Sequence, residues 1–161
     1  MRSTARSALV ALILLLASSA PAFADNARPM YGQISLTVVP AEPRCGPDAL
    51  TLGLVGVGNA THLGSITGSA TNCTEFTLAT EAVDTWDGVA TYVAADGSTL
   101  TTAYAGSQDA PVAGVASAET THTVIGGTGR FTGATGLWTI RGQIDFVSGT
   151  FNGSMSGWIQ Y

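Results

Sequence analysis

Lysine is absent from this 161-residue sequence, and charged residues of all kinds make up only 11% of it. The six basic residues are all arginine, and two of them, Arg2 and Arg6, lie in the N-terminal leader described below. The rest of the chain therefore contains four arginines and eleven Asp and Glu residues. Binding to phosphate backbones or to anionic lipid needs several Lys or Arg side chains. We therefore expect no nucleic-acid partner and, once the leader is removed, no association with membranes.

An apolar run long enough to span a membrane, about 20 residues, is also missing. The run at residues 8–17 is shorter; it follows a basic start and precedes small residues that end in Ala22-Phe23-Ala24. This order is typical of a signal peptide cut after an A-x-A site. We predict a signal peptide at residues 1–24 and a single domain at residues 25–161, secreted or periplasmic. The alternative, a retained membrane anchor, needs a longer run.

Cysteine and histidine are scarce, with two of each in the sequence. In an oxidising compartment an isolated cysteine pair is most simply a disulfide, which stabilises a fold by about 3–4 kcal/mol. The alternative is a metal site built from Cys45, Cys73, His62 and His122. Metal motifs place two ligands within a few residues of each other, as in C-x-x-C, and this sequence has no such pair. We predict a Cys45–Cys73 disulfide, no metal and no cofactor.

Apolar and polar residues alternate with period two through most of the chain, which is typical of half-buried strands. In the clearest case, residues 137–147, the side chains from Trp138 to Phe146 at every second position share one face. Turn signals such as Asp96-Gly97 separate the runs, and glycines inside strands suggest sharp coiling. We predict an all-β fold, a small antiparallel barrel of about eight short strands. The predicted strands lie near residues 33–38, 50–55, 62–70, 74–80, 88–94, 100–106, 115–125, 137–147 and 151–161.

The most distinctive segment is a glycine-rich run at residues 124–136. Nucleotide-binding loops of this composition need a following helix or, in the P-loop, a lysine. Here a short stretch that resembles a β-hairpin follows, and no lysine exists. We interpret the run as a tight crossing between two strands, with Phe131 inserted as a plug and Arg130 as a clamp beside the glycine turn. The residues of this structural motif are Gly126, Gly127, Thr128, Gly129, Arg130, Phe131, Gly133, Ala134 and Gly136.

The same segment resembles the I-x-G-G-T-G-x-F-x-x-A-x-G signature of dirigent proteins and of the wider allene oxide cyclase barrel superfamily. Two shorter pieces, at residues 60–64 and 94–97, follow the order seen in small exported bacterial relatives. The resemblance covers about residues 56–161 and implies an eight-stranded antiparallel barrel with a central cavity, often trimeric in the plant members. Plant enzymes of this kind steer radical coupling or cyclise a fatty-acid epoxide. Their pocket residues align with no position here, so the resemblance implies the fold and not the chemistry.

Few residues are candidates for catalysis, and the hydrolase pattern G-x-S-x-G is absent. His62 and His122 are candidate acids or bases, with cross-strand hydrogen bonding as the alternative. Arg141 and Asp145 share one strand face and are most simply solvated surface charges. If that face points into the barrel, Arg141 would need a partner such as a ligand carboxylate.

Three functional hypotheses follow. The first is an exported, non-catalytic barrel that binds a small apolar ligand or acts as an extracellular structural or interaction module, with a homo-oligomer such as a trimer as a candidate assembly. The second is a cyclase- or dirigent-like enzyme, for which His122, Arg141 and Asp145 are the candidate catalytic residues and which requires a hollow barrel with convergent polar groups. The third is carbohydrate binding or adhesion on the outer face, which requires tryptophan side chains exposed together in one patch.

Overall fold

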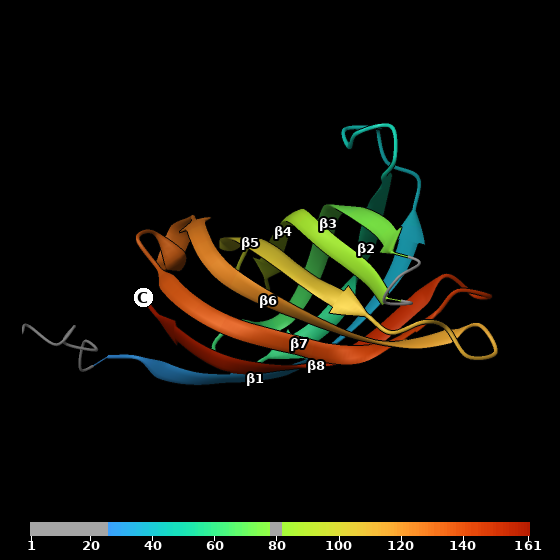
Figure 1. Cartoon of the computed structure of the whole chain (residues 1–161). Coiled ribbons are helices and arrows are strands. Elements are labelled where there is room, and N and C mark those ends of the chain that lie inside the picture. Colours follow the sequence, from blue (N-terminus) through green and yellow to red (C-terminus); the bar gives the residue numbers. More distant parts are fainter. Residues whose placement is uncertain (1–25, 78–81) are drawn as a thin grey trace, which may run out of the picture.

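Eight antiparallel strands form one closed barrel in the computed structural model, which describes residues 26–77 and 82–161. Each strand pairs with the next along the chain, and β8 pairs with β1 to close the sheet (Figure 1). This topology confirms the predicted all-β antiparallel barrel. The predicted signal peptide at residues 1–24 lies outside the described residues. The strands are β1 (Arg28–Val39), β2 (Leu50–Ala60), β3 (Gly64–Thr77), β4 (Ala82–Ala94), β5 (Thr99–Gln108), β6 (Val115–Gly127), β7 (Thr135–Asp145) and β8 (Thr150–Gln160).

Each strand turns alternate side chains into the barrel, as period-two patterning requires. On β7, Trp138 and Ile140 are buried, whereas Arg141 next to them is exposed. Phe146 continues the alternation in sequence, but its side chain is 46% exposed, so its predicted place on the inner face is wrong. The reason is local: β7 ends at Asp145, whose carboxylate accepts hydrogen bonds from backbone N–H groups of the following turn.

The sequence predicted two strands where the structure has the single strand β3. A shift of register between Thr71 and Cys73 marks a β-bulge at this point. The bulge breaks the alternation of side chains without ending the strand, so the predicted boundary before residue 74 is wrong. His62, predicted within the strand, lies instead in the turn before β3 with φ 69°. Residues 78–80 of the predicted strand lie outside the described residues.

The two ends of the barrel differ. One end, here called the plugged end, carries the turns at residues 61–63 and 95–98 and the β6–β7 connection. This connection contains a short 3-10 helix (Gly129–Phe131) that turns the Phe131 ring inward, where it is fully buried. The opposite end, here called the mouth end, carries the loop at residues 40–49 and the shorter connections at residues 109–114 and 146–149.

Side chains fill the barrel at the plugged end. Phe131 packs edge-on against Tyr161, with ring centroids 5.0 Å apart. The Arg130 guanidinium joins two turns there, because Nη1 lies 3.4 Å from the Asp96 carboxylate and Nη2 donates a hydrogen bond to the Leu63 carbonyl oxygen. The glycine-rich run therefore closes this end and anchors the turns around it. The buried side chains packed there are Met30, Leu63, Leu100, Phe131 and Ile159. Within the described part of the chain, no helix has the length and apolarity to cross a membrane.

Candidate functional site

A cavity of about 70 Å³ lies inside the barrel toward the mouth end. The cavity wall extends to the mouth end through three half-buried side chains, Leu52, Gln108 and Phe151. A void of this size has room for several water molecules or for part of a small ligand. The barrel is therefore packed at one end and hollow at the other. The apolar wall is made by Ile34, Leu36, Leu52, Leu54, Ala70, Ala90, Ala118, Ile140, Ile144 and Phe151.

Polar side chains converge on the cavity from β3, β4, β5 and β6. The Tyr104 hydroxyl donates a hydrogen bond of 3.0 Å to Oδ1 of Asn72, which sits in the β3 bulge and is 2% exposed. The amide nitrogen of Asn72 donates to the Thr74 hydroxyl at 2.6 Å. An apolar pocket with a few oriented polar groups is the usual form of a small-molecule site. The polar members of the lining are Ser69, Asn72, Thr85, Tyr92, Tyr104, Gln108, Thr120 and His122.

His122 is the centre of a row of stacked rings on adjacent strands. Tyr104, His122 and Trp138 are register partners across β5, β6 and β7. The His122 ring lies 4.6 Å from the Tyr104 ring and 6.0 Å from the Trp138 ring, with interplanar angles of 14° and 4°. Pairs of rings at such separations stabilise a core beyond their buried area. The row therefore forms a rigid inner wall of the barrel.

Burial keeps the His122 imidazole neutral. Desolvation lowers its pKa from 6.5 to about 3. Both ring nitrogens already have neutral partners, with the Thr102 hydroxyl 3.1 Å from Nδ1 and the Thr120 hydroxyl 3.0 Å from Nε2. A general base working near neutral pH needs a pKa near 7. His122 is too weak a base for that work, and its geometry is that of a hydrogen-bonding wall residue.

The two phenols that line the cavity are also held neutral. Desolvation by burial raises the pKa of Tyr92, and the neighbouring Tyr104 raises it further. Burial likewise raises the pKa of Tyr104. At neutral pH both groups are therefore hydroxyl donors rather than phenolates. Together with His122 they present the cavity with dipoles and no charge.

Gly88 sets the position of the Tyr104 ring. The two residues are register partners on β4 and β5. A Cβ atom at Gly88 would lie 2.6 Å from the Tyr104 ring, which is closer than non-bonded carbon atoms approach. The missing side chain at this position lets the ring lie flat against β4 and direct its hydroxyl to Asn72.

Gln108 is a polar residue of the cavity lining. Its Nε2 lies 3.5 Å from the Thr85 hydroxyl. Its buried Oε1 has no hydrogen-bond donor within the described part of the chain. A buried carbonyl oxygen without a donor costs about 1–3 kcal/mol. Gln108 therefore places an unsatisfied acceptor within the wall of the barrel.

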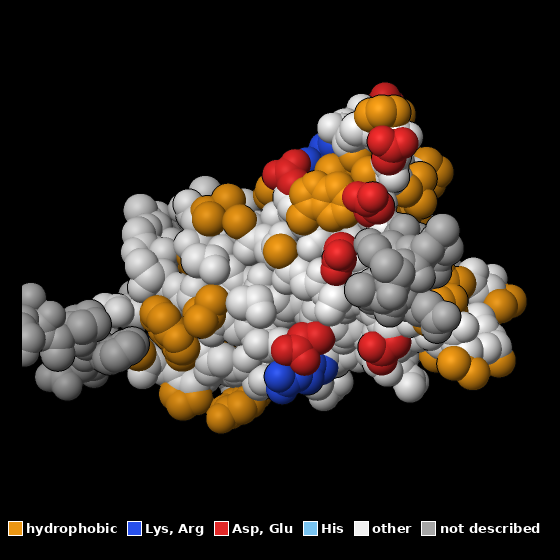
Figure 2. Space-filling view, viewed as in Figure 1, with side chains coloured by type: hydrophobic (Ala, Val, Ile, Leu, Met, Phe, Trp, Pro, Cys, Tyr) orange, Lys and Arg blue, Asp and Glu red, His pale blue; other side chains and the backbone are white. Residues whose placement is uncertain are grey.

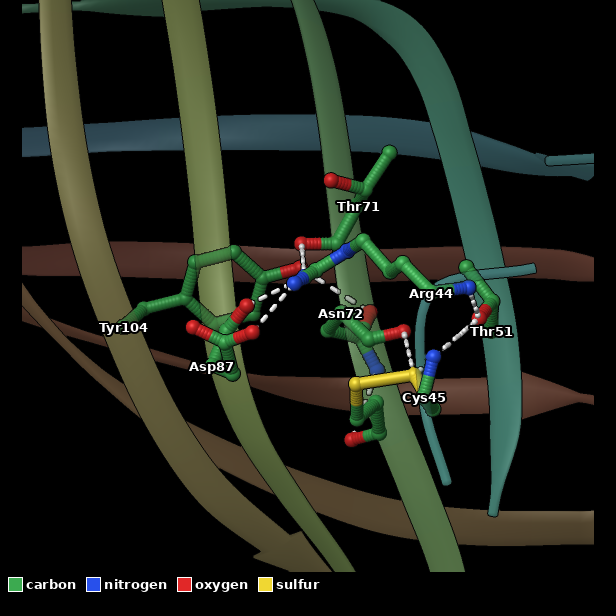
Figure 3. A network of polar contacts seen from close by, with 8 residues as sticks. Arg44, Cys45, Thr51, Thr71, Asn72, Asp87 and Tyr104 are labelled. Atoms are coloured by element: carbon green, nitrogen blue, oxygen red, sulfur yellow. Dashed lines mark hydrogen bonds and ion pairs between the residues drawn. A yellow bond between two sulfur atoms is a disulfide. The ribbon is translucent and has the colours of Figure 1, made fainter. Parts of the chain in front are cut away.

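The loop at residues 40–49 is fastened to the barrel at the mouth end (Figure 3). A disulfide joins Cys45 to Cys73 on β3, which confirms the predicted pairing. The Arg44 guanidinium binds the Asp87 carboxylate and carbonyl oxygen and donates to the Thr71 carbonyl oxygen at 3.3 Å. Asp87 lies in a β4 bulge with φ 50°, a conformation uncommon outside glycine. The bulge therefore turns Asp87 toward the loop.

Of the candidates predicted from sequence, the structure places only His122 at the cavity. Arg141 points outward and forms a bidentate ion pair with Glu119, with distances of 2.7 and 3.0 Å. Asp145 ends β7, and the backbone N–H groups of Val147 and Ser148 donate to its carboxylate. His62 lies at the plugged end, where its Nε2 is 3.1 Å from the Pro29 carbonyl oxygen. The geometry brings none of these three residues to the cavity.

The tryptophans do not form the exposed patch that the carbohydrate-binding hypothesis requires. Trp138 is 1% exposed and belongs to the inner ring row. Trp86 is 37% exposed and lies in the β4 bulge. Trp158, on β8, is half-buried. Trp138 is therefore excluded from any such patch, because β7 alternation turns it inward.

Asn72 and Gln108 are two of the polar site residues that sequence reasoning missed. Both occupy inward positions of their strands, and Gln108 is four residues beyond Tyr104 on β5. A polar residue at an inward position is the signal that could have found them. The bulge at Asn72 hides that signal in β3, and the prediction ended the β5 strand at residue 106. Within the described residues, no group of three or more His, Cys, Asp or Glu side chains could hold a metal ion.

The fold and the site together define a closed antiparallel β-barrel with a one-ended, neutral cavity. No protein-family model and no curated protein matches the sequence. Among solved structures, the chain is similar to the pterocarpan synthase dirigent protein PsPTS1, at 15% identity and a TM-score of 0.47 over 85% of this chain and 96% of that chain. It is also similar to the pterocarpan synthase dirigent protein GePTS1, at 14% identity and a TM-score of 0.45 over 92% and 99%. The relation to allene oxide cyclases stays a prediction.

Proposed function

We propose that this protein is an exported, non-catalytic barrel that binds a small, mostly apolar molecule in its mouth-end cavity. The cavity itself carries the proposal. Side chains at the plugged end of the barrel are fully buried. A void remains near the mouth, where Leu36, Leu52 and Phe151 line the cavity. Apolar walls bind an apolar body, and neutral polar groups on one side orient it.

The electrostatics of the wall support binding rather than catalysis. A catalytic role for His122 would need a proton affinity near neutral pH, and its pKa is lowered to about 3. Arg141 and Asp145, the other candidates for an enzyme, lie outside the barrel. The cyclase- or dirigent-like alternative is therefore not favoured.

Export is part of the same proposal. The Cys45–Cys73 disulfide is compatible with an extracellular or periplasmic location, where such bonds persist. The leader sequence at residues 1–24 supports the same address.

Filling the cavity tests the binding function. Ala118 lines the cavity, whereas Ala105 is exposed on the outer face of β5. An Ala118→Leu variant should fold, as judged by far-UV circular dichroism, and should bind benzyl alcohol about tenfold more weakly than the wild type, because leucine takes the space of a buried ring. Ala105→Leu adds the same side chain outside and should bind like the wild type.

Binding is measured by NMR titration, with shifts expected at the Gln108 side-chain amide and the Trp138 indole N–H. Equal affinities of the two leucine variants for benzyl alcohol would show that the cavity is not the binding site. A wild type that binds no benzyl alcohol, even in a saturated solution of it, would show the same.

A further inference from the structure

Carboxylates surround the mouth of the cavity. They come from the connections at residues 40–49 and 109–114 and from strand segments at this end of the barrel. In Figure 2 the acidic side chains gather over this half of the molecule. We call these residues the acidic rim. They are Glu42 and Asp48 in the loop at residues 40–49, Glu75 on β3, Asp84 and Asp87 on β4, Asp109 after β5, and Asp145 at the end of β7.

The rim adjoins the cavity wall along the chain. Three residues that line the cavity, Thr85 on β4, Gln108 at the end of β5 and Ile144 on β7, are each next in the chain to a rim carboxylate. Because successive residues of a strand point to opposite faces, the carboxylates stay in solvent while their neighbours face the cavity. Ionised groups thus encircle a neutral interior.

Little positive charge balances the rim. Among the described residues, Arg44 is the cation at this end, and it already binds Asp87. Arg28 and Arg130 lie at the plugged end, and Arg141 pairs with Glu119 on the side of the barrel. Glu75 and Asp84 are even direct register partners, an arrangement of like charges that disfavours the sheet. The mouth therefore carries a net negative potential that the rest of the surface does not share.

We propose that the occupant of the cavity is a small hydrophobic amine, bound as its ammonium ion with the apolar body inside and the charged end at the mouth. This inference rests on the proposed binding function and names the class of its ligand. The acidic rim attracts a cation and repels a carboxylate or phosphate of the same shape. Gln108, which lines the cavity and is next in the chain to Asp109, joins the neutral wall to the rim.

The size of the effect follows from Coulomb's law. At roughly 10 Å in water and about 10 mM salt, the net charge of the rim should favour a monovalent cation over a neutral molecule by about twentyfold. In about 150 mM salt the same advantage should fall to about threefold, because the Debye length shortens to about 8 Å. A carboxylate should be disfavoured by similar factors.

Three probes with one apolar body test the inference: benzylamine, benzyl alcohol and phenylacetate. NMR titration of the wild type in low salt should give affinities in that order, and added salt should bring the three together. Neutralising two rim residues in Asp84→Asn/Asp109→Asn should lower the amine-to-alcohol affinity ratio by about threefold. The control Asp96→Asn removes a charge from the plugged end, away from the rim, and it should keep the ratio of the wild type.

The outcomes separate this inference from the function on which it rests. If benzyl alcohol binds in the cavity and benzylamine binds no better, the amine inference is wrong and the binding function stands. The same holds if the preference for the amine changes neither with salt nor with the rim substitutions. If benzyl alcohol and benzylamine both fail to bind, both proposals fall. A preference for phenylacetate would overturn the inference directly.

Discussion

Removal of the disulfide should cost this barrel a large part of its stability. The Cys45–Cys73 bond closes a loop with a sequence separation of 28 residues. In the chain-entropy model, a loop of that length restricts the unfolded chain by about 3.6 kcal/mol at 25 °C. The native state should keep its structure in a Cys45→Ala/Cys73→Ala variant, because Arg44 and Thr51 still hold the loop by hydrogen bonds. The loss therefore appears in the unfolded state.

Urea unfolding followed by tryptophan fluorescence measures this loss, and thermal unfolding should show a melting temperature lowered by roughly 12 °C for a domain of this size. Arg44→Gln is the matched control. It removes the ion pair to Asp87 but keeps the covalent link, and it should cost less than about 1 kcal/mol because both side chains are partly exposed. A double cysteine variant that loses less than about 1 kcal/mol would refute the loop-closure reasoning, as would an Arg44→Gln variant that loses as much as the cysteine pair.

Three further predictions concern the interior. The free energy of unfolding should fall by up to about 1.4 kcal/mol per pH unit as the pH drops below 6.5, because the unfolded imidazole takes up a proton that buried His122, with its pKa of about 3, does not. Urea unfolding of His122→Phe between pH 7 and about 4.5 should show a shallower slope, and an unchanged slope would contradict the assignment. Phe131→Ala should lower the free energy of unfolding by about 3–5 kcal/mol, since the ring is fully buried at the plugged end; a loss below about 1 kcal/mol in the same assay would mean that the ring is not a plug. Gly157→Ala should cost about 1–3 kcal/mol in thermal unfolding, because its Cβ would meet the Leu137 carbonyl oxygen, whereas a Cβ at Gly126 has nothing within 4 Å and should cost much less. Equal losses for the two glycines would argue against tight packing at Gly157.

Local patterns in the sequence were sufficient for the barrel itself. The alternation on β7 and β8, the Asp96-Gly97 turn and the inward Phe131 all depend on residues close together in the chain. The pairing of Cys45 with Cys73 needed no geometry either, since only two cysteines exist. Two expectations failed, one at a bulge without a local signal and one at a turn whose cause is local. The bulge at Asn72 made one strand look like two, and the turn after Asp145 removed Phe146 from the inner face.

The site depended on distant residues and could not be predicted in the same way. Tyr104 and His122 are 18 positions apart in number, yet their rings stack because β5 and β6 pair in one particular register. A shift of one residue would turn either ring outward. The registers of β3 with β4 and of β4 with β5 bring Asn72 to the Tyr104 hydroxyl.

Composition, period-two alternation and the cysteine count specify a small, acidic, antiparallel β-barrel with one disulfide and a glycine-rich crossing, because each acts locally or along the whole chain. The plugged end and the hollow end of the barrel arise from the three-dimensional packing instead. Barrel closure and strand register bring together side chains from several strands. The burial and the contacts of His122, Tyr104 and Gln108 depend on that closure and register.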